Sequence, residues 1–367
     1  MPCSAVRAIL LVGFISAVVT VAAGTPADPE QELAKAEARV TAWDGPVSGP
    51  HAVPNKTIVF LSGDLRNGGV LGVAIGVREA GKALGWKIRI VDLQGRGEAA
   101  YPKAISDAIA LHPDGVILAG ISNALETEAT LRPFTEKKIP ILGWHIGSTP
   151  GPMPGTPVLL NVTTDPRKVA RIAALAALSS RESKAGVVIF TDTRFLIAKT
   201  KSDTIREIVA GTPNCEILQV CDVPLDEAAT ATPPITRELL AKYGARWTHA
   251  LAINDLYFDH ATPVFAVAGL RADGSINCVS AGDGSVSAYM RIEAGLFQTG
   301  TVAEPLNLQG WQLLDEMNRV FSGVPLSGYV TPVHLVTTDN IMYDGGPQRR
   351  FDPDNGYREA YRKIWRR

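Results

Sequence analysis

The feature of this sequence that most constrains its fold is a repeating alternation of short apolar runs with longer segments of helical spacing. The runs begin just after Lys56 and lie at 57–61, 87–92, 115–119 and 140–144. Each has the length of a buried strand, and the segments between them place apolar residues on one helical face. Four such units in a row predict a parallel sheet with helices on both of its faces.

The alternation begins again after a segment rich in proline and glycine at 150–157. Its apolar runs lie at 185–190, 216–220, 249–253 and 276–279, and helices are expected between them at 198–210, 234–243 and 259–270. A chain of 367 residues is long enough for two domains of about 150 residues each. The sequence therefore predicts two α/β domains built on the same plan.

Two acidic residues lie at the ends of neighbouring apolar runs. Asp283 follows one run between Gly282 and Gly284, and these glycines permit a sharp turn. Glu304 ends the next run, directly before Pro305, which stops that strand. Ligands of open α/β sheets bind outside the carboxyl ends of the strands. We therefore expect Asp283 and Glu304 to line a ligand-binding site.

Composition argues against several classes of function. Hydrophobic residues make up 46% of the chain and charged residues 20%, which is enough for ordinary cores. The formal net charge of −1 argues against nucleic-acid binding, which needs clustered basic residues. The six histidines show no metal-ligand spacing, and the glycines form no phosphate-binding motif in a suitable context. We therefore expect neither a metal nor a cofactor.

The first residues, 1–23, have the pattern of a cleaved signal peptide. A basic residue, Arg7, precedes an apolar run at 8–21, and small residues follow before a plausible cleavage site. The run is short for a membrane span, and an uncleaved anchor is the alternative. This pattern predicts export to the periplasm. Residues 24–54 are then expected to form a surface arm, packed through Trp43.

Seven short motifs occur in a characteristic order and spacing behind this signal. They lie at 76–86, 92–94, 113–117, 138–142, 253–255, 282–284 and 292–295. In this order they resemble the type I periplasmic sugar-binding proteins, the ribose-binding-like group that feeds ABC importers. The resemblance extends from about Lys56 to Thr338, which is most of the mature chain.

The resemblance implies an α/β fold of two similar Rossmann-like lobes, with parallel sheets, joined by a hinge of three crossovers. The crossovers would fall near Asn161, Glu304 and Pro332. The N-terminal lobe would comprise 55–161 plus 305–332, and the C-terminal lobe 162–304 plus 333–367. A ligand would bind between the lobes and be buried when they close.

The resemblance also implies ligand contacts, some of which depart from the family's pattern. Asn67, Asn254 and Asp283 fall on positions that bond sugar hydroxyls in the family. Lys201 stands where the family usually has arginine, and His145 where aspartate is common. Glu304 occupies a hinge position that usually carries glutamine or a similar polar residue. The candidate set is Asp64, Arg66, Asn67, Trp144, His145, Phe195, Lys201, Asn254, Asp283 and Glu304.

The aromatic residues that often enclose the sugar ring in this family are missing. Gly69, Val70 and Gly282 stand at those positions, so the pocket differs from that of a ribose-binding protein. Trp144, Phe195 and Tyr257 are the nearest aromatic residues that could supply a ring face instead.

Several candidates also have a purely structural interpretation. Asp283 could cap its turn, and Asn254 could cap the following helix, with Asp255 as a cap or brace. Trp144 could belong to the core, and His145 could serve only the conformation of its loop. Lys201 could be an exposed helical residue, which is the commoner situation for lysine.

The leading functional hypothesis is a periplasmic protein that captures a small sugar or polyol and delivers it to an ABC transporter permease. The alternative is a periplasmic receptor that presents its ligand-bound form to a sensor kinase or chemoreceptor. A repressor with the same lobes would need a helix-turn-helix before the first strand, where the signal peptide lies instead. An enzyme is not expected, because no nucleophile–base motif is evident. We expect a monomer that binds no nucleic acid.

Overall fold

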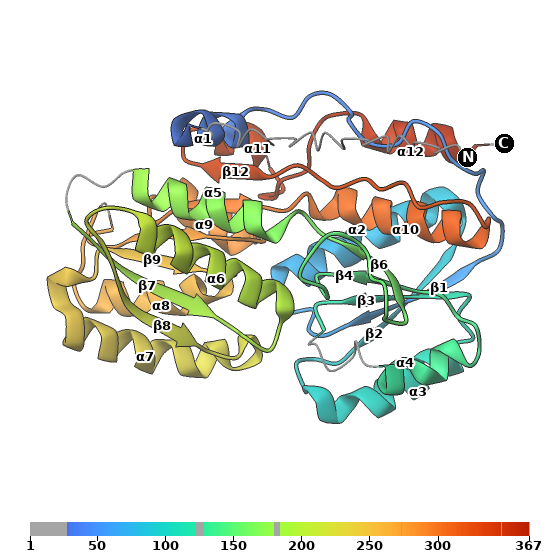
Figure 1. Ribbon diagram of the computed structural model, residues 1–367, viewed down its shortest axis with the longest axis horizontal. Coiled ribbons are helices and arrows are strands. Elements are labelled where there is room, and N and C mark those ends of the chain that lie inside the picture. Colours follow the sequence, from blue (N-terminus) through green and yellow to red (C-terminus); the bar gives the residue numbers. More distant parts are fainter. Residues whose placement is uncertain (1–27, 122–127, 180–183, 273, 346, 367) are drawn as a thin grey trace, which may run out of the picture.

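The computed structural model describes residues 28–121, 128–179, 184–272, 274–345 and 347–366. Within these ranges the chain forms two lobes that lie side by side, each with a six-stranded sheet and flanking helices (Figure 1). The prediction of two α/β lobes is therefore confirmed. The expected signal peptide at 1–23 lies outside the described residues. No helix in the described ranges is both long and apolar enough to cross a membrane.

The sheet of the first lobe has the strand order β2-β1-β3-β4-β6-β5. Its strands are β1 (Thr57–Ser62), β2 (Lys87–Asp92), β3 (Gly115–Ala119), β4 (Ile141–Trp144), β5 (Gly151–Pro152) and β6 (Val158–Val162). All neighbours pair in parallel except β5 with β6. The helices of this lobe are α2 (Gly68–Leu84), α3 (Tyr101–Ala110), α4 (Glu128–Thr135) and α10 (Leu306–Phe321).

Helices α2 and α10 cross closely because glycines lie at their contact. A Cβ on Gly310 would lie 2.5 Å from the backbone nitrogen of Val77, and one on Gly76 would lie 2.5 Å from the carbonyl oxygen of Asn307. Neither position can carry a side chain without moving the facing helix. The glycines therefore allow α10, which returns from the second lobe, to complete the core of the first.

The sheet of the second lobe has the strand order β12-β11-β10-β9-β7-β8. Its strands are β7 (Ala185–Thr191), β8 (Cys215–Asp222), β9 (His249–Ala252), β10 (Asn277–Ser280), β11 (Gln298–Ala303) and β12 (His334–Thr337), the last antiparallel to β11. The helices are α5 (Pro166–Ser179), α6 (Leu196–Gly211), α7 (Ala228–Tyr243), α8 (Leu256–Val267) and α9 (Val286–Glu293). The chain passes between the lobes after β6, after β11 and before β12 (Figure 1).

Helix α7 begins earlier than the sequence pattern indicated. We expected it at 234–243, starting at Pro234 because proline suits the first helical turn. The helix instead begins at Ala228 and contains both Pro233 and Pro234. The preceding segment, rich in alanine, has the propensity to extend the helix by these extra residues.

The C-terminal tail divides between the two lobes, which corrects the expectation that all of 333–367 belongs to the second. β12 and α11 (Ile341–Asp344) remain in the second lobe, but α12 (Tyr357–Trp365) packs on α10 in the first-lobe core. Trp365 stacks on Trp311 with ring centroids 5.3 Å apart and donates a hydrogen bond to the buried Asp315 carboxylate at 2.8 Å. The sequence analysis did not predict α12, because charged residues separate the apolar residues of its buried face.

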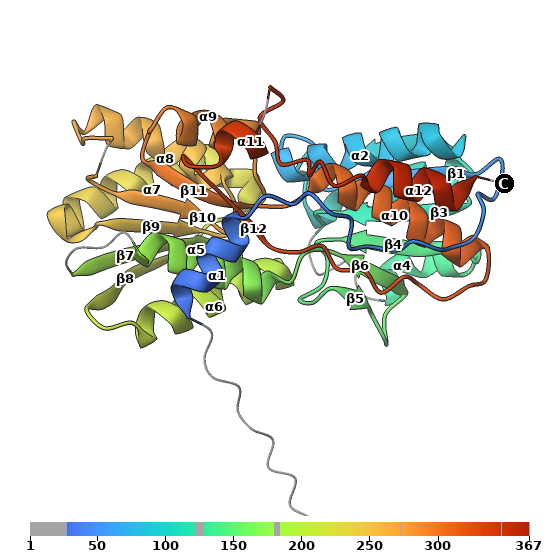
Figure 2. The ribbon, with the colours of Figure 1, turned by 90° about the horizontal axis from the view of Figure 1, so that it is seen from above.

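The N-terminal arm lies along both lobes (Figure 2). Helix α1 (Pro29–Glu37) packs on the second lobe, where Glu32 pairs with Arg171 at 2.7 Å. Further along, Trp43 packs against Tyr361 of the first lobe with ring centroids 5.3 Å apart. Val53 then accepts a hydrogen bond from the indole of Trp86 at 2.7 Å. The arm is thus a packed part of the fold that spans the two lobes.

We predict that Trp365→Ala lowers the free energy of unfolding by about 3–5 kcal/mol, because it removes a buried aromatic ring and the hydrogen bond to Asp315. Urea unfolding followed by circular dichroism measures this difference. Met342→Ala is the control, since Met342 is 75% exposed and its loss should change stability by less than about 0.5 kcal/mol. Equal stability of the two variants would mean that α12 contributes little to the first-lobe core.

Candidate ligand-binding site

A cavity between the lobes is formed by loops at the carboxyl ends of strands from both sheets. The first lobe supplies residues that follow β1, β3 and β4, and the second supplies residues from α6 and from the ends of β9 and β10. The lining residues are Asn67, Val70, Gly120, Trp144, His145, Phe195, Ile197, Ala198, Lys201, Leu225, Ile253, Asn254 and Asp283. Seven of the ten candidates from the sequence lie in this set.

The loop that carries Asp283 is held in place by a second carboxylate, that of Asp255. Gly282 and Gly284 have φ angles of 127° and 83°, which other residues rarely adopt. The buried Asp255 carboxylate accepts hydrogen bonds from the backbone nitrogens of Gly284 and Ser285 at 2.9 and 3.0 Å. Burial raises the pKa of Asp255 above its ordinary value, although these hydrogen bonds oppose the shift. Asp255 therefore acts as a brace for this loop.

Asp283 is oriented so that one of its oxygens faces the cavity. Its Oδ2 accepts a hydrogen bond from Nδ2 of Asn254 at 2.9 Å, while Oδ1 lies 3.7 Å from Nζ of Lys201 and 3.9 Å from Nδ1 of His145. The other end of the Asn254 side chain accepts a hydrogen bond from the backbone nitrogen of Leu256 at 3.0 Å. Asn254 thus holds the backbone at the first residue of α8 and positions Asp283 at the same time.

Lys201 is buried, so its interpretation as an exposed helical residue is wrong. Its exposed fraction is 2%, because it lies on the inward face of α6, four residues after the buried Ile197. A Cβ on Gly282 would lie 2.8 Å from the Lys201 ammonium. The glycine at this position therefore leaves the space that the ammonium occupies beside Asp283.

His145 lies between the cavity and the hinge. Its ring stacks on Trp144 with centroids 3.7 Å apart, and its Nε2 lies 3.5 Å from Oε1 of Glu304. Trp144 is 1% exposed, and its indole donates a hydrogen bond to Gln309 of α10 at 2.7 Å. Trp144 is therefore largely a core residue that supports His145 from behind.

Glu304, which we expected to line the site, is not among the residues that line the cavity; it lies beneath His145 and connects the crossovers. Its Oε2 accepts hydrogen bonds from Thr164 Oγ1 and Gln309 Nε2, both at 2.5 Å. The Thr164 hydroxyl lies 2.8 Å from that of Thr331, which belongs to the third crossover. Burial alone would raise the pKa of Glu304, but His145, Lys201 and Thr164 together lower it to about 2.

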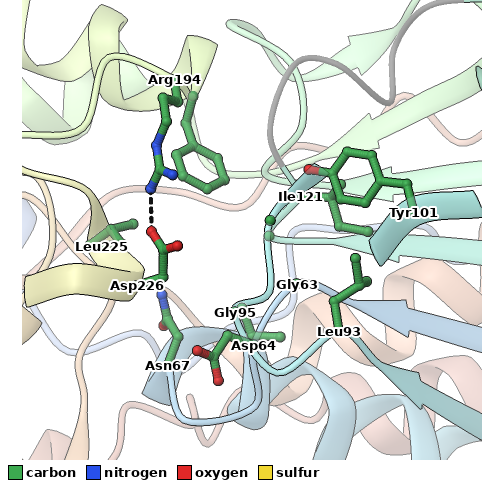
Figure 3. A pocket seen from close by; sticks show the side chains of 14 residues that line it. Gly63, Asp64, Asn67, Leu93, Gly95, Tyr101, Ile121, Arg194, Leu225 and Asp226 are labelled. Carbon is green, nitrogen blue, oxygen red and sulfur yellow. Dashed lines mark hydrogen bonds and ion pairs between the residues drawn. The ribbon is translucent and has the colours of Figure 1, made fainter. Parts of the chain in front are cut away.

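A second part of the cleft, here called the outer cleft, adjoins this cavity, and Figure 3 shows the side chains that line it. Asp64 lies on its first-lobe side and pairs with Arg66 within the same loop at 2.6 Å. The Arg66 side chain is 71% exposed and faces a groove on another side of the lobe interface, so it is not brought to the cavity. Phe195 is half-buried and lines both parts of the cleft.

The structure also separates one aromatic candidate from the cleft and adds residues that the sequence analysis did not single out. Tyr257 is fully buried in the second-lobe core, where its hydroxyl donates to the carbonyl oxygen of Val223 at 2.6 Å. Arg194 and Asp226 form an ion pair at the outer cleft with a separation of 2.5 Å. Arg194 lies three residues after the end of β7, a placement that could have identified it.

With this geometry established, comparison with known proteins places the chain in a family. The model of the periplasmic binding protein domain matches residues 58–324, so the chain belongs to the periplasmic binding protein family. Its fold is the type I two-lobe fold of that family's sugar-binding members. No curated protein matches the sequence closely enough to count as a relative.

Solved structures share this fold at low sequence identity. A solute-binding protein of an ABC transporter from Agrobacterium vitis, with bound allitol, is 19% identical with a TM-score of 0.65, covering 78% of this chain and 97% of that one. A galactofuranose-binding protein is 16% identical with a TM-score of 0.67, covering 84% and 98%. The arabinose-binding protein of an ABC transporter from Shewanella sp. ANA-3 is 17% identical with a TM-score of 0.67, covering 84% and 95%.

We predict that Glu304 makes the free energy of unfolding decrease at acidic pH. Its pKa is about 2 in the folded protein against an ordinary value of 4.5, so its ionised form stabilises the fold above pH 4.5. This contribution, on the order of 3 kcal/mol, is lost as the pH falls toward 2. Glu304→Gln should be less stable than the wild type near neutral pH, and the gap should narrow on acidification.

Urea unfolding from neutral pH to about pH 2.5 tests this expectation for Glu304. Glu98→Gln provides the control, because Glu98 is exposed and its variant should follow the wild type at every pH. A stability gap for Glu304→Gln that stays constant with pH would show that the effect comes from altered packing.

Proposed function

We propose that this protein is exported to the periplasm, captures a small neutral sugar or polyol between its lobes, and delivers it to an ABC transporter permease. The observation that carries the proposal is a buried cluster whose donors and acceptors face one cavity: Asp283, Lys201, His145 and Asn254.

The cluster has hydrogen-bonding capacity that a ligand hydroxyl would satisfy. Oδ1 of Asp283 and Nζ of Lys201 are 3.7 Å apart, which is beyond hydrogen-bond distance. Buried polar groups of native proteins nearly always have partners. Adjacent sugar hydroxyls, which both donate and accept, suit an acceptor and a donor placed side by side.

The charge balance of the cluster favours a neutral ligand. Lys201 is opposed by two carboxylates, those of Asp283 and Glu304, with His145 between them. The site therefore has no excess positive charge with which to compensate an anionic ligand. A hydroxylated molecule needs no such compensation, and charge-assisted hydrogen bonds from the cluster would hold it firmly.

Both lobes contribute to the site, as capture by closure requires. The start of α2 lies so close to the second lobe that a side chain at Gly69 would overlap the Asp283 carboxylate, and a Cβ on Gly68 would lie 2.9 Å from that of Ser285. A ligand that contacts both sides stabilises the closed arrangement by those additional contacts. The hydroxylated ligands named for the Agrobacterium, galactofuranose and Shewanella proteins are in keeping with this proposal.

Delivery to a permease rests on the family membership, and export rests on the pattern at 1–23. The competing role, presentation to a sensor kinase or chemoreceptor, makes a different genetic prediction. Deleting the gene should abolish uptake of the radiolabelled ligand if the protein serves a transporter. If the protein serves a receptor, uptake would persist and only the response to the ligand would be lost.

We predict that Asp283→Asn weakens ligand binding at least tenfold while the fold is retained, because a charge-assisted hydrogen bond is worth about 1.5–3 kcal/mol. A thermal-shift screen of the mature protein against pentoses, hexoses, deoxy sugars and polyols, including allitol and L-arabinose, identifies the sugars to test. Titration calorimetry with the sugar that raises the melting temperature most then compares the variants.

Asp203→Asn is the matched control, since Asp203 lies on the solvent side of α6 and pairs with Lys199 there. It should bind as the wild type does. Unchanged affinity in Asp283→Asn would remove Asp283 from the site. No thermal shift with any sugar, after unfolding and refolding to strip bound ligand, would contradict the proposed function itself.

A further inference from the structure

An apolar wall, formed by Val70, Phe195 and Leu225, lies where the two parts of the cleft meet. The inner cavity and the outer cleft share Asn67, Val70, Gly120, Phe195 and Leu225, so they form one continuous space. Beyond this shared part, Leu93 and Ile121 continue the apolar wall on the first-lobe side (Figure 3).

The charged residues of the outer cleft are already engaged with each other. Asp64 pairs with Arg66, and Arg194 pairs with both Asp192 and Asp226 at 2.7 and 2.5 Å. Asn67 is also partly engaged, because its Oδ1 accepts a hydrogen bond from the backbone nitrogen of Gly69 and begins α2.

Polar and apolar groups alternate along the cleft. In the inner cavity, Asp283 lies 3.7 Å from Lys201 and 3.9 Å from His145. Val70 and Leu225 line both parts of the cleft, whereas the paired Arg194 and Asp226 line only the outer part. The hydroxyl of Tyr101, which points into the pocket in Figure 3, is a further polar group of the outer part.

From this arrangement we propose that the ligand is amphipathic: a sugar whose hydroxyls meet the inner cluster and whose part against the shared apolar wall is deoxygenated, as in a 6-deoxyhexose. The proposal rests on the proposed function and names its substrate class more narrowly. Val70, Phe195 and Leu225 form the wall that selects the apolar part.

A fully hydroxylated sugar and its 6-deoxy form should differ in their free energy of binding at this wall. A hydroxyl buried against apolar side chains loses its hydrogen bonds to water, which weakens binding when no partner replaces them. A methyl group at the same position strengthens binding through burial of apolar surface. The two effects act in the same direction, so the deoxy sugar should bind at least tenfold more tightly than its parent, since 1.4 kcal/mol corresponds to a factor of ten.

Matched sugar pairs test this inference by titration calorimetry on the mature protein. The pairs are D-fucose with D-galactose, L-fucose with L-galactose, L-rhamnose with L-mannose, and D-quinovose with D-glucose. The members of each pair differ only in the 6-hydroxyl. We expect that, in the pair that binds most tightly, the deoxy member has a dissociation constant at least tenfold lower.

Two variants of the wall make the test specific to the residues named. Val70→Thr is nearly isosteric, and Leu225→Gln places an amide on the wall; each should reduce the preference for the deoxy sugar at least threefold. Val267→Thr is the control, because Val267 is 91% exposed and is absent from the residues that line the described cleft. Circular dichroism and melting temperature establish that each variant is folded.

The outcomes separate the inference from the proposed function. Equal or tighter binding of the fully hydroxylated member in the tightest pair would overturn the amphipathic ligand but leave a sugar-binding protein. A deoxy preference that survives in both wall variants would show that other residues select the ligand and would also overturn the inference. Binding of no sugar in the panel would contradict the proposed function, and the inference would fall with it.

Discussion

The Glu304 carboxylate is the group on which the relation between the lobes depends. It is fully buried where the chain leaves the second lobe after β11, and it accepts hydrogen bonds from Thr164 of the first crossover and Gln309 of α10. Thr164 in turn contacts Thr331 of the third crossover. One carboxylate thus joins three segments that are far apart in sequence. An isolated buried charge would be unstable, but the surrounding donors and cations compensate it.

The same network extends to the ligand site. Gln309 accepts a hydrogen bond from the Trp144 indole, and Trp144 supports the His145 ring, which lies between Glu304 and Asp283. A ligand that bonds to His145 or Asp283 therefore acts on a cluster already connected to the hinge. The cavity and the crossovers are therefore joined by one continuous cluster of packed and hydrogen-bonded side chains.

The sequence alone predicted the parts of this protein that local patterns determine. Apolar runs separated by helical spacing predicted both sheets, and a strand end located Asp283, because carboxyl ends of parallel strands share one edge. The family resemblance located Asn254. Side-chain burial could not be predicted in the same way. The pattern left open whether Lys201 is exposed and whether Tyr257 faces the ligand, because it does not specify the packing of α6 and α8, which turns the lysine toward the cleft and the tyrosine into the core.

The arm and tail add to the restraints on lobe motion. The arm passes from Glu32, paired in the second lobe, to Trp43, packed in the first, and the tail passes in the same sense from α11 to α12. Figures 1 and 2 place both along one side of the molecule, beside the segment that leads to β12. Both ends of each connection are packed, so lobe separation on that side would break buried contacts at one end.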